Sequence, residues 1–412
     1  MIAAAVFVLT YALISVGNVP KLRINRGLAA ALGGILMLLL GIVPFTDIPG
    51  LVDLDVIFLL LGMMLLVAGL EFSGFFRIVS DALIARSGSR VKLLAYVMVI
   101  CAVLSAVALN DAVVMMFTPV VIRCCRRTGG NPIPYLTGVM FSANIGSLAT
   151  YIGNPQNVYI ASESGMSFID FAAGTLPISL VCLPIAFIII YAVFRKTLSS
   201  DAPAGHDTDG TETDRIRLFA VMAILIGALI GFGSSSVTGI PTYAVALTAG
   251  VLALAVVMSK APKNIVWAAE KINWNIIIFF IGLFVLMGGI VDSGLLDQIA
   301  SLFPGFGPGE TPSVAGVMVF SAVLSNLVSN VPAVMLTANM LPAGDMTLWV
   351  ALAASSTLAG NTTLIGSAAN VIVSERSEEA GIKFSFWRFA LIGIPVTVLT
   401  LLAALAVITV MF

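Results

Sequence analysis

Residues 103–119, VLSAVALNDAVVMMFTP, and residues 323–339, VLSNLVSNVPAVMLTAN, are two copies of one apolar unit that begin 220 positions apart. Each copy places an asparagine, Asn110 or Asn330, in the middle of the apolar run. A polar side chain is costly in lipid, so these asparagines need a protein or water environment at membrane depth. Paired units of this kind are typical of ion-coupled transporters that hold substrate between two repeats.

The composition agrees with a membrane protein. Of the 412 residues, 59% are hydrophobic and only 10% are charged, whereas soluble domains carry about a quarter charged residues. Apolar runs of about 20 residues recur along the chain, enough to cross the bilayer as helix. We therefore predict an all-α polytopic membrane protein. The net charge of −1 gives no reason to expect a nucleic-acid partner, and the cysteine spacing gives none to expect a metal or other cofactor.

About ten membrane spans are predicted, two of them broken. They lie near 2–19, 27–44, 53–71, 132–170 (broken), 172–194, 218–234, 240–258, 274–291, 347–373 (broken) and 388–411. The first 20 residues lack a positive leading region and a cleavage site, so we expect a retained span and not a signal peptide.

Two further apolar segments, 91–125 and 312–341, are interpreted as re-entrant hairpins. Their second arms, about 112–122 and 331–341, are too short to cross the bilayer, and their tips are polar. The distribution of charged residues does not decide between a re-entrant hairpin and two full spans, because every loop would lie on the same side of the membrane in both topologies.

With this predicted topology, all 20 lysines and arginines lie on one side of the membrane. The first basic loop, for example, carries Lys21, Arg23 and Arg26, while the opposite loops near Asp47 and Asp345 carry no basic residue. The positive-inside rule makes the basic side cytoplasmic. Both termini are then expected outside a plasma or inner membrane, and no lysine or arginine is expected at membrane depth.

The internal repeat extends beyond the opening pair. Residues 55–74 match 275–294, and ATYIGNPQNV at 149–158 matches TTLIGSAANV at 362–371. Corresponding spans cross in opposite directions, so the repeats are inverted. The predicted organisation is a first span and turn (1–26), repeat 1 (27–196), a cytoplasmic linker (197–217), a connecting span (218–239) and repeat 2 (240–412).

Polar residues interrupt the apolar pattern at four places. These are Asn110-Asp111, Asn330-Val331-Pro332, residues 144–157 and residues 355–370. Each is interpreted as a helix that stops and restarts, as where Asn154 precedes Pro155. Restarted helices present free N–H groups that attract an anion or an oxygen-rich solute, and the preceding carbonyls can bind a cation. The alternative is that the breaks are kinks that satisfy their own backbone.

Asp111 is the one acidic residue predicted near the bilayer centre, and its repeat partner is Val331. A carboxylate there could bind Na⁺ together with Asn110 and Asn330, or take up and release a proton. Alternatively, it caps the helix of its own hairpin.

At these motifs the chain resembles the ion transporter superfamily, which includes arsenite permeases, pink-eyed-dilution-type permeases and divalent anion/sodium symporters. The similarity covers nearly the whole chain and is carried by LNDAVVMMFTPVVI (109–122), SANIGSLATYIGNPQN (142–157) and SNVPAVML (329–336). In the sodium-coupled dicarboxylate branch both hairpin tips read Ser-Asn-Thr. Here residues 109–111 read Leu-Asn-Asp and residues 329–331 read Ser-Asn-Val, so both tips depart from that pattern. The Asn-Asp tip leans toward the arsenite permeases.

The resemblance implies a central cavity, an elevator-like motion and a possible homodimer. By resemblance, the cavity is lined by Asn110, Asp111, Asn144, Asn154, Asn157, Asn330, Thr362, Thr363 and Asn370. We add Thr150, Gly153, Ser329 and Gly366, which belong to the same motifs.

The expected function is secondary active transport by alternating access. Proton-coupled efflux of arsenite or antimonite is the first hypothesis, as the resemblance implies. A Na⁺- or H⁺-coupled transporter of divalent anions or dicarboxylates, and a cation/proton antiporter that uses Asp111, are the alternatives. No Ser/His pair, HExxH or GxGD pattern points to an enzyme.

Overall fold

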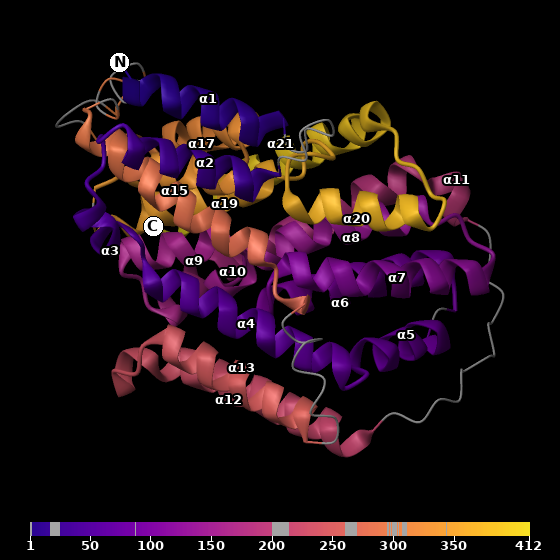
Figure 1. The fold of residues 1–412 in the computed structure, drawn as a ribbon. Helices are drawn as coiled ribbons and strands as arrows, with labels where there is room; N and C mark the ends of the chain where they lie inside the picture. Colours follow the sequence, from indigo (N-terminus) through magenta and orange to yellow (C-terminus); the bar gives the residue numbers. More distant parts are fainter. Residues whose placement is uncertain are drawn as a thin grey trace.

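The computed structural model describes residues 2–16, 25–86, 88–199, 214–259, 270–294, 296, 298, 303, 305–306, 311–342 and 344–412. Across these residues the chain is helical and contains no strand (Figure 1). Most of the predicted linker 197–217 lies outside the described residues, as do the basic residues Lys21, Arg23, Lys260 and Lys263.

The helices follow one another in an order that matches the predicted spans closely. They are α1 Ile2–Val16, α2 Arg26–Leu39, η1 Phe45–Asp47, α3 Ile48–Leu51, α4 Leu54–Phe72, α5 Phe75–Arg86, α6 Arg90–Val107, α7 Asn110–Thr128, α8 Ile133–Ser147, η2 Tyr151–Gly153, α9 Pro155–Ser164, α10 Phe168–Val193, α11 Arg195–Leu198, α12 Arg215–Thr238, α13 Thr242–Met258, α15 Trp274–Asp292, α17 Val314–Val328, α18 Asn330–Ala338, α19 Met346–Ala359, α20 Ala368–Glu379 and α21 Phe386–Met411.

Six of the described helices are long and apolar enough to cross a membrane: α4, α6, α10, α12, α15 and α21. Five of them are predicted spans, and α6 is the first arm of a predicted hairpin. The spans predicted at 2–19, 27–44 and 240–258 form shorter apolar helices, and both broken spans divide as expected into α8–α9 and α19–α20.

The two hairpins differ in the length of their second arms. In the second hairpin, α18 has 9 residues, too few to cross a bilayer. In the first, α7 has 19 residues and is about 28 Å long, so the argument from a short second arm is wrong for this hairpin. Re-entrance of the hairpins therefore stays a prediction.

Helices of the two halves pack in a crossed pattern: α4 lies against α13, and α2 lies against α15 (Figure 1). Both crossings depend on a glycine. A Cβ added to Gly62 would lie 2.3 Å from the backbone of Ala246, and one added to Gly282 would lie 2.4 Å from the backbone of Ala30. The same close approach on both sides is what two inverted copies of one unit would produce.

Pairing within each half repeats as well. The first arm of each hairpin packs on the first half of the following broken helix, α6 on α8 and α17 on α19. Helix α5 was not expected from the sequence. It carries Arg77, Asp81 and Arg86 within 12 residues, so no apolar run indicates it.

Candidate functional site

A cavity of about 510 Å³ lies where the two hairpin tips meet the two broken helices. It is lined by Asn25, Arg26, Gly27, Asn110, Asp111, Pro155, Gln156, Asn273, Asn275, Ile276, Phe279, Phe280, Ser329, Asn330, Val331, Ile365, Ser367, Ala368, Val371, Ile372 and Glu375. Both sequence copies quoted at the outset therefore reach one cavity through their central asparagines.

The four helices that follow the polar breaks begin at the cavity wall. Helix α7 begins at Asn110, α18 at Asn330, α9 at Pro155 and α20 at Ala368, and all four residues line the cavity. The first N–H groups of a helix have no partner within the helix and carry partial positive charge. The breaks thus give the cavity a set of backbone donors that suits a solute rich in oxygen.

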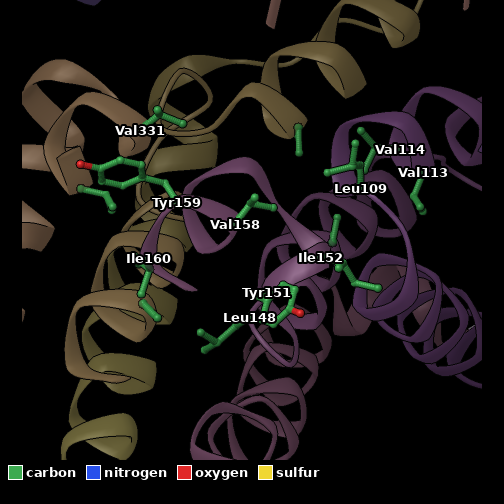
Figure 2. Packing of buried hydrophobic residues seen from close by; sticks show 14 of the residues in the cluster. Leu109, Val113, Val114, Leu148, Tyr151, Ile152, Val158, Tyr159, Ile160 and Val331 are labelled. Carbon is green, nitrogen blue, oxygen red and sulfur yellow. The ribbon is translucent and has the colours of Figure 1, made fainter. Parts of the chain in front are cut away.

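Buried apolar side chains hold the first hairpin tip and the break after α8 in place (Figure 2). Leu109 and Val114 of the hairpin and Ile152 of the break all belong to the hydrophobic core, with at most 2% of each side chain exposed. Lipid and water are excluded here, so the polar groups of the break must find partners in the protein.

The two breaks satisfy their polar groups in the same way. Asn157 Nδ2 donates to Ser147 O and Thr150 O, at 3.1 and 3.3 Å. Asn370 Nδ2 donates to the corresponding carbonyls, Gly360 O at 2.8 Å and Thr363 O at 3.0 Å.

The restarted helices are also capped alike. Asn154 Oδ1 accepts from the N–H of Asn157 at 2.8 Å, and Ser367 Oγ accepts from the N–H of Asn370 at 3.1 Å. An N-cap of this kind fixes where each half-helix resumes. The helix restart expected where Asn154 precedes Pro155 is confirmed, with Asn154 as the N-cap.

Each broken helix also bonds to the break of the other. Asn144 Nδ2 of α8 donates to Asn361 Oδ1 at 2.9 Å, to Ser367 Oγ at 3.1 Å and to Asn370 Oδ1 at 3.2 Å. In the reverse direction, Thr357 Oγ1 of α19 donates to Asn157 Oδ1 at 3.4 Å. All of these side chains are buried, so the two breaks are joined through a dry polar network.

This network gives a first testable expectation. Replacing Asn144 with alanine leaves buried oxygens of Asn361 and Asn370 short of a donor, so we expect unfolding to become easier by about 1–3 kcal/mol. Thermal unfolding of the purified protein measures this. Asn326→Ala is the matched control, because Asn326 is exposed and its hydrogen bonds within the described residues go to the backbone carbonyls of Ala322 and Ala359. Equal losses from both variants would contradict the role assigned to Asn144.

The two hairpin tips are not equivalent. With its amide oriented to suit its neighbours, Asn330 Nδ2 donates to Gly366 O and Ser356 O, each at 3.2 Å. Asn110 is 5% exposed, and its Oδ1 has no hydrogen-bond partner among the described residues. A buried amide oxygen without a partner is uncommon, and Asn110 is one of the residues that line the cavity.

Four of the candidate residues line the cavity: Asn110, Asp111, Ser329 and Asn330. The other nine lie beside it in the broken helices, and the cavity-lining set does not include them. These are Asn144, Thr150, Gly153, Asn154, Asn157, Thr362, Thr363, Gly366 and Asn370. The binding role of all thirteen stays a prediction.

Arg26 lines the cavity, so the expectation of no lysine or arginine at this depth is wrong. Helix α2 begins at Arg26, one residue before the predicted span, and its guanidinium lies 3.5 Å from Ser329 Oγ and 3.4 Å from Ile365 O. Asp111 and Glu375 are the opposite charges that act on it. The sequence placed Arg26 in a basic loop because a charge at the edge of an apolar run looks like a loop residue.

Other lining residues were also missed. Gln156 directly follows the Asn-Pro pair, and Asn275 is the repeat counterpart of Asp55, so both had a signal in the motifs. Glu375 had none, because it falls in the charged end of α20.

The chain resembles known transporters over most of its length. A family model described as CitMHS, citrate transporter, matches residues 9–354. The chain is 32% identical over 428 residues to a 46 kDa membrane protein of Mycobacterium leprae (strain TN), a match covering 98% of this chain and 97% of that protein. It is 28% identical over 454 residues to the silicon efflux transporter LSI3 of Oryza sativa subsp. japonica, covering 92% and 91%.

The fold has a solved counterpart in the crystal structure of the Alcanivorax borkumensis YdaH transporter. The TM-score is 0.57, with 16% identity, and the match covers 89% of this chain and 87% of that one. The predicted membership of the ion transporter superfamily is confirmed. The chain belongs to the CitMHS citrate transporter family and is a multi-pass membrane transporter.

Proposed function

We propose that the protein is a secondary transporter that exports a small, undissociated inorganic hydroxide, arsenous or antimonous acid, in exchange for protons. The unpaired amide oxygen of Asn110, a residue of the cavity wall, is the observation that carries this proposal. An amide group both donates and accepts, and a hydroxyl does the same. A small solute bearing several hydroxyls complements it.

The charges in the cavity agree with a neutral solute. One arginine, Arg26, and two carboxylates, Asp111 and Glu375, line it, so the wall has no excess of positive charge. The remaining polar lining consists mainly of amides. A divalent anion would meet repulsion from both carboxylates, whereas an undissociated acid would not.

Asp111 is the proposed proton carrier. It lies in the first turn of α7, is 8% exposed and shares the cavity with Arg26. A carboxylate that contacts the solute cavity can exchange its proton when the cavity changes sides.

Arg26 favours a second candidate function, the transport of a carboxylate such as citrate or succinate. Together with the four helix N-termini, its guanidinium could bind a carboxylate. Protonation of Asp111 would remove one repelling charge. The family description as citrate transporters supports this candidate, and the rice relative named for silicon efflux supports the first.

Parallel assays separate the two. The protein is expressed in a host that lacks its own arsenite pump, and resistance and uptake are measured with arsenite, succinate, citrate and Na⁺. We expect arsenite resistance and proton-dependent arsenite flux with no dependence on Na⁺. Flux of a carboxylate without arsenite flux would replace the first proposal with the second.

Asn110→Ala tests the amide itself. Because Asn110 Oδ1 bonds to no described part of the protein, its removal should leave the melting temperature nearly unchanged while arsenite affinity falls about tenfold, as for one lost hydrogen bond. Asn330→Ala is the matched control, since that amide bonds to the carbonyls of Ser356 and Gly366 and its loss should lower the melting temperature. Unchanged arsenite affinity in Asn110→Ala would remove the amide from the site.

A further inference from the structure

A second hollow lies along α7 and the end of α20, and it shares no lining residue with the solute cavity. It consists of two adjoining cavities of about 630 and 380 Å³ that share Pro119, Arg123 and Arg376. We call them together the basic hollow. Its lining is Glu71, Phe76, Arg77, Met115, Met116, Pro119, Val120, Ile122, Arg123, Arg126, Arg127, Lys271, Arg376, Glu379 and Ala380.

Positive charge exceeds negative charge strongly in the basic hollow. Six of its residues are basic and two are acidic. Both acids already have a cation, because Glu71 Oε1 lies 2.7 Å from Lys271 Nζ and Glu379 Oε2 lies 3.0 Å from Arg376. Arg123 is exposed and makes no ion pair within the described chain. The excess of positive charge therefore attracts an anion to the hollow.

The arginines come from different helices and meet here. Arg123, Arg126 and Arg127 lie on α7, Arg376 lies on α20, and Arg77 lies on α5. A preference for basic residues on one side of the membrane explains their number but does not require them to face one hollow. Guanidinium groups gathered in this way are suited to bind phosphate oxygens two at a time.

We propose that the basic hollow binds a phosphate group, carried by an anionic phospholipid or free as a soluble phosphate. Part of the wall is apolar, formed by Phe76, Met115, Met116 and Val120, and can contact an acyl chain beside the headgroup. This proposal is independent of the transported solute.

Two helices connect the basic hollow to the solute cavity, so a phosphate bound in the hollow would affect the position of the cavity wall. Helix α7 reaches from Asn110 and Asp111 in the cavity to Arg126 in the hollow. Helix α20 likewise reaches from Ala368 in the cavity to Arg376 in the hollow, and the two helices pack together. A phosphate that joined them to Arg77 of α5 would restrain any movement of α7 and α20 past α5.

The test uses the full-length protein in nanodiscs and measures binding of phosphatidylglycerol, phosphatidylcholine and inorganic phosphate by native mass spectrometry and thermal shift. We expect phosphatidylglycerol to bind more tightly than phosphatidylcholine. The double variant Arg123→Gln/Arg376→Gln should lose at least about tenfold in this affinity. Arg195→Gln/Arg388→Gln, two exposed arginines outside the hollow, is the matched control and should bind as the parent does.

Each outcome decides the proposal. Competition by inorganic phosphate supports a soluble source, and binding of phosphatidylglycerol alone supports a lipid. A second variant, Arg123→Lys/Arg376→Lys, keeps the charge but loses the two-pronged guanidinium. It should recover part of the affinity, which separates lost binding from misfolding. Equal binding of the two phospholipids, or equal losses in the Gln and control variants, would overturn the proposal.

Discussion

Asp111→Asn is expected to reduce proton-coupled arsenite flux to the level of protein-free vesicles. The amide has nearly the shape of the carboxylate, but it cannot bind and release a proton at physiological pH. Asp111 lines the solute cavity and shares it with the positive charge of Arg26, so its protonation would change the net charge around the solute. Flux into proteoliposomes under an imposed pH gradient measures the effect.

Two comparisons make this result specific. Asp47→Asn changes an exposed carboxylate in η1 and should leave flux as in the parent. The size-exclusion profile and melting temperature of Asp111→Asn should stay close to those of the parent, because asparagine can still accept hydrogen bonds at the start of α7. Coupled flux near the parental rate in a folded Asp111→Asn protein would rule out Asp111 as the proton carrier.

Valine at either crossing glycine, Gly62→Val or Gly282→Val, is expected to destabilise the protein by at least about 3 kcal/mol, the upper end of what overpacking costs. The added Cβ would lie 2.3 or 2.4 Å from the backbone of Ala246 or Ala30, and a helix backbone cannot turn away as a side chain can. We expect melting temperatures lower by at least about 3–4 °C, measured by thermal unfolding in detergent.

Gly227→Val is the control for these two variants. Gly227 lies within α12, and a Cβ added there meets nothing within 4 Å. The same valine therefore changes helix propensity and chain entropy without the clash. If all three valine variants lowered the melting temperature equally, the close crossings would not be responsible.

Much of the fold follows from local patterns that any apolar chain displays. The run lengths predicted the long helices, and the matching stretches 55–74 and 275–294 indicated that α4 and α15 are counterparts. Asn154 before Pro155 located the restart of a broken helix to the residue. These signals are short in range, so one sequence was enough to find them.

What the sequence did not reveal depends on contacts between distant segments. Nothing near Asn144 indicates that its amide reaches Asn361 and Asn370, more than 200 residues later. Thr357 lies in the predicted break at 355–370, but nothing near it indicates a bond to Asn157, since a threonine in an apolar helix usually bonds to its own backbone. Arg26 was misplaced by a single residue at a helix start, the least certain part of such a prediction.

The hydrogen bonds between the two broken helices can form only after the second half of the chain has been synthesised. The ribosome adds Asn144 long before it adds Asn361, Ser367 and Asn370, which follow by 217, 223 and 226 residues. Until those residues have entered the bilayer, the amide of Asn144 in the first half lacks these hydrogen-bond acceptors. A truncated chain that ends before α19 would therefore keep an unsatisfied buried amide. We expect the cell's quality control to recognise it as incomplete even when its own helices have inserted.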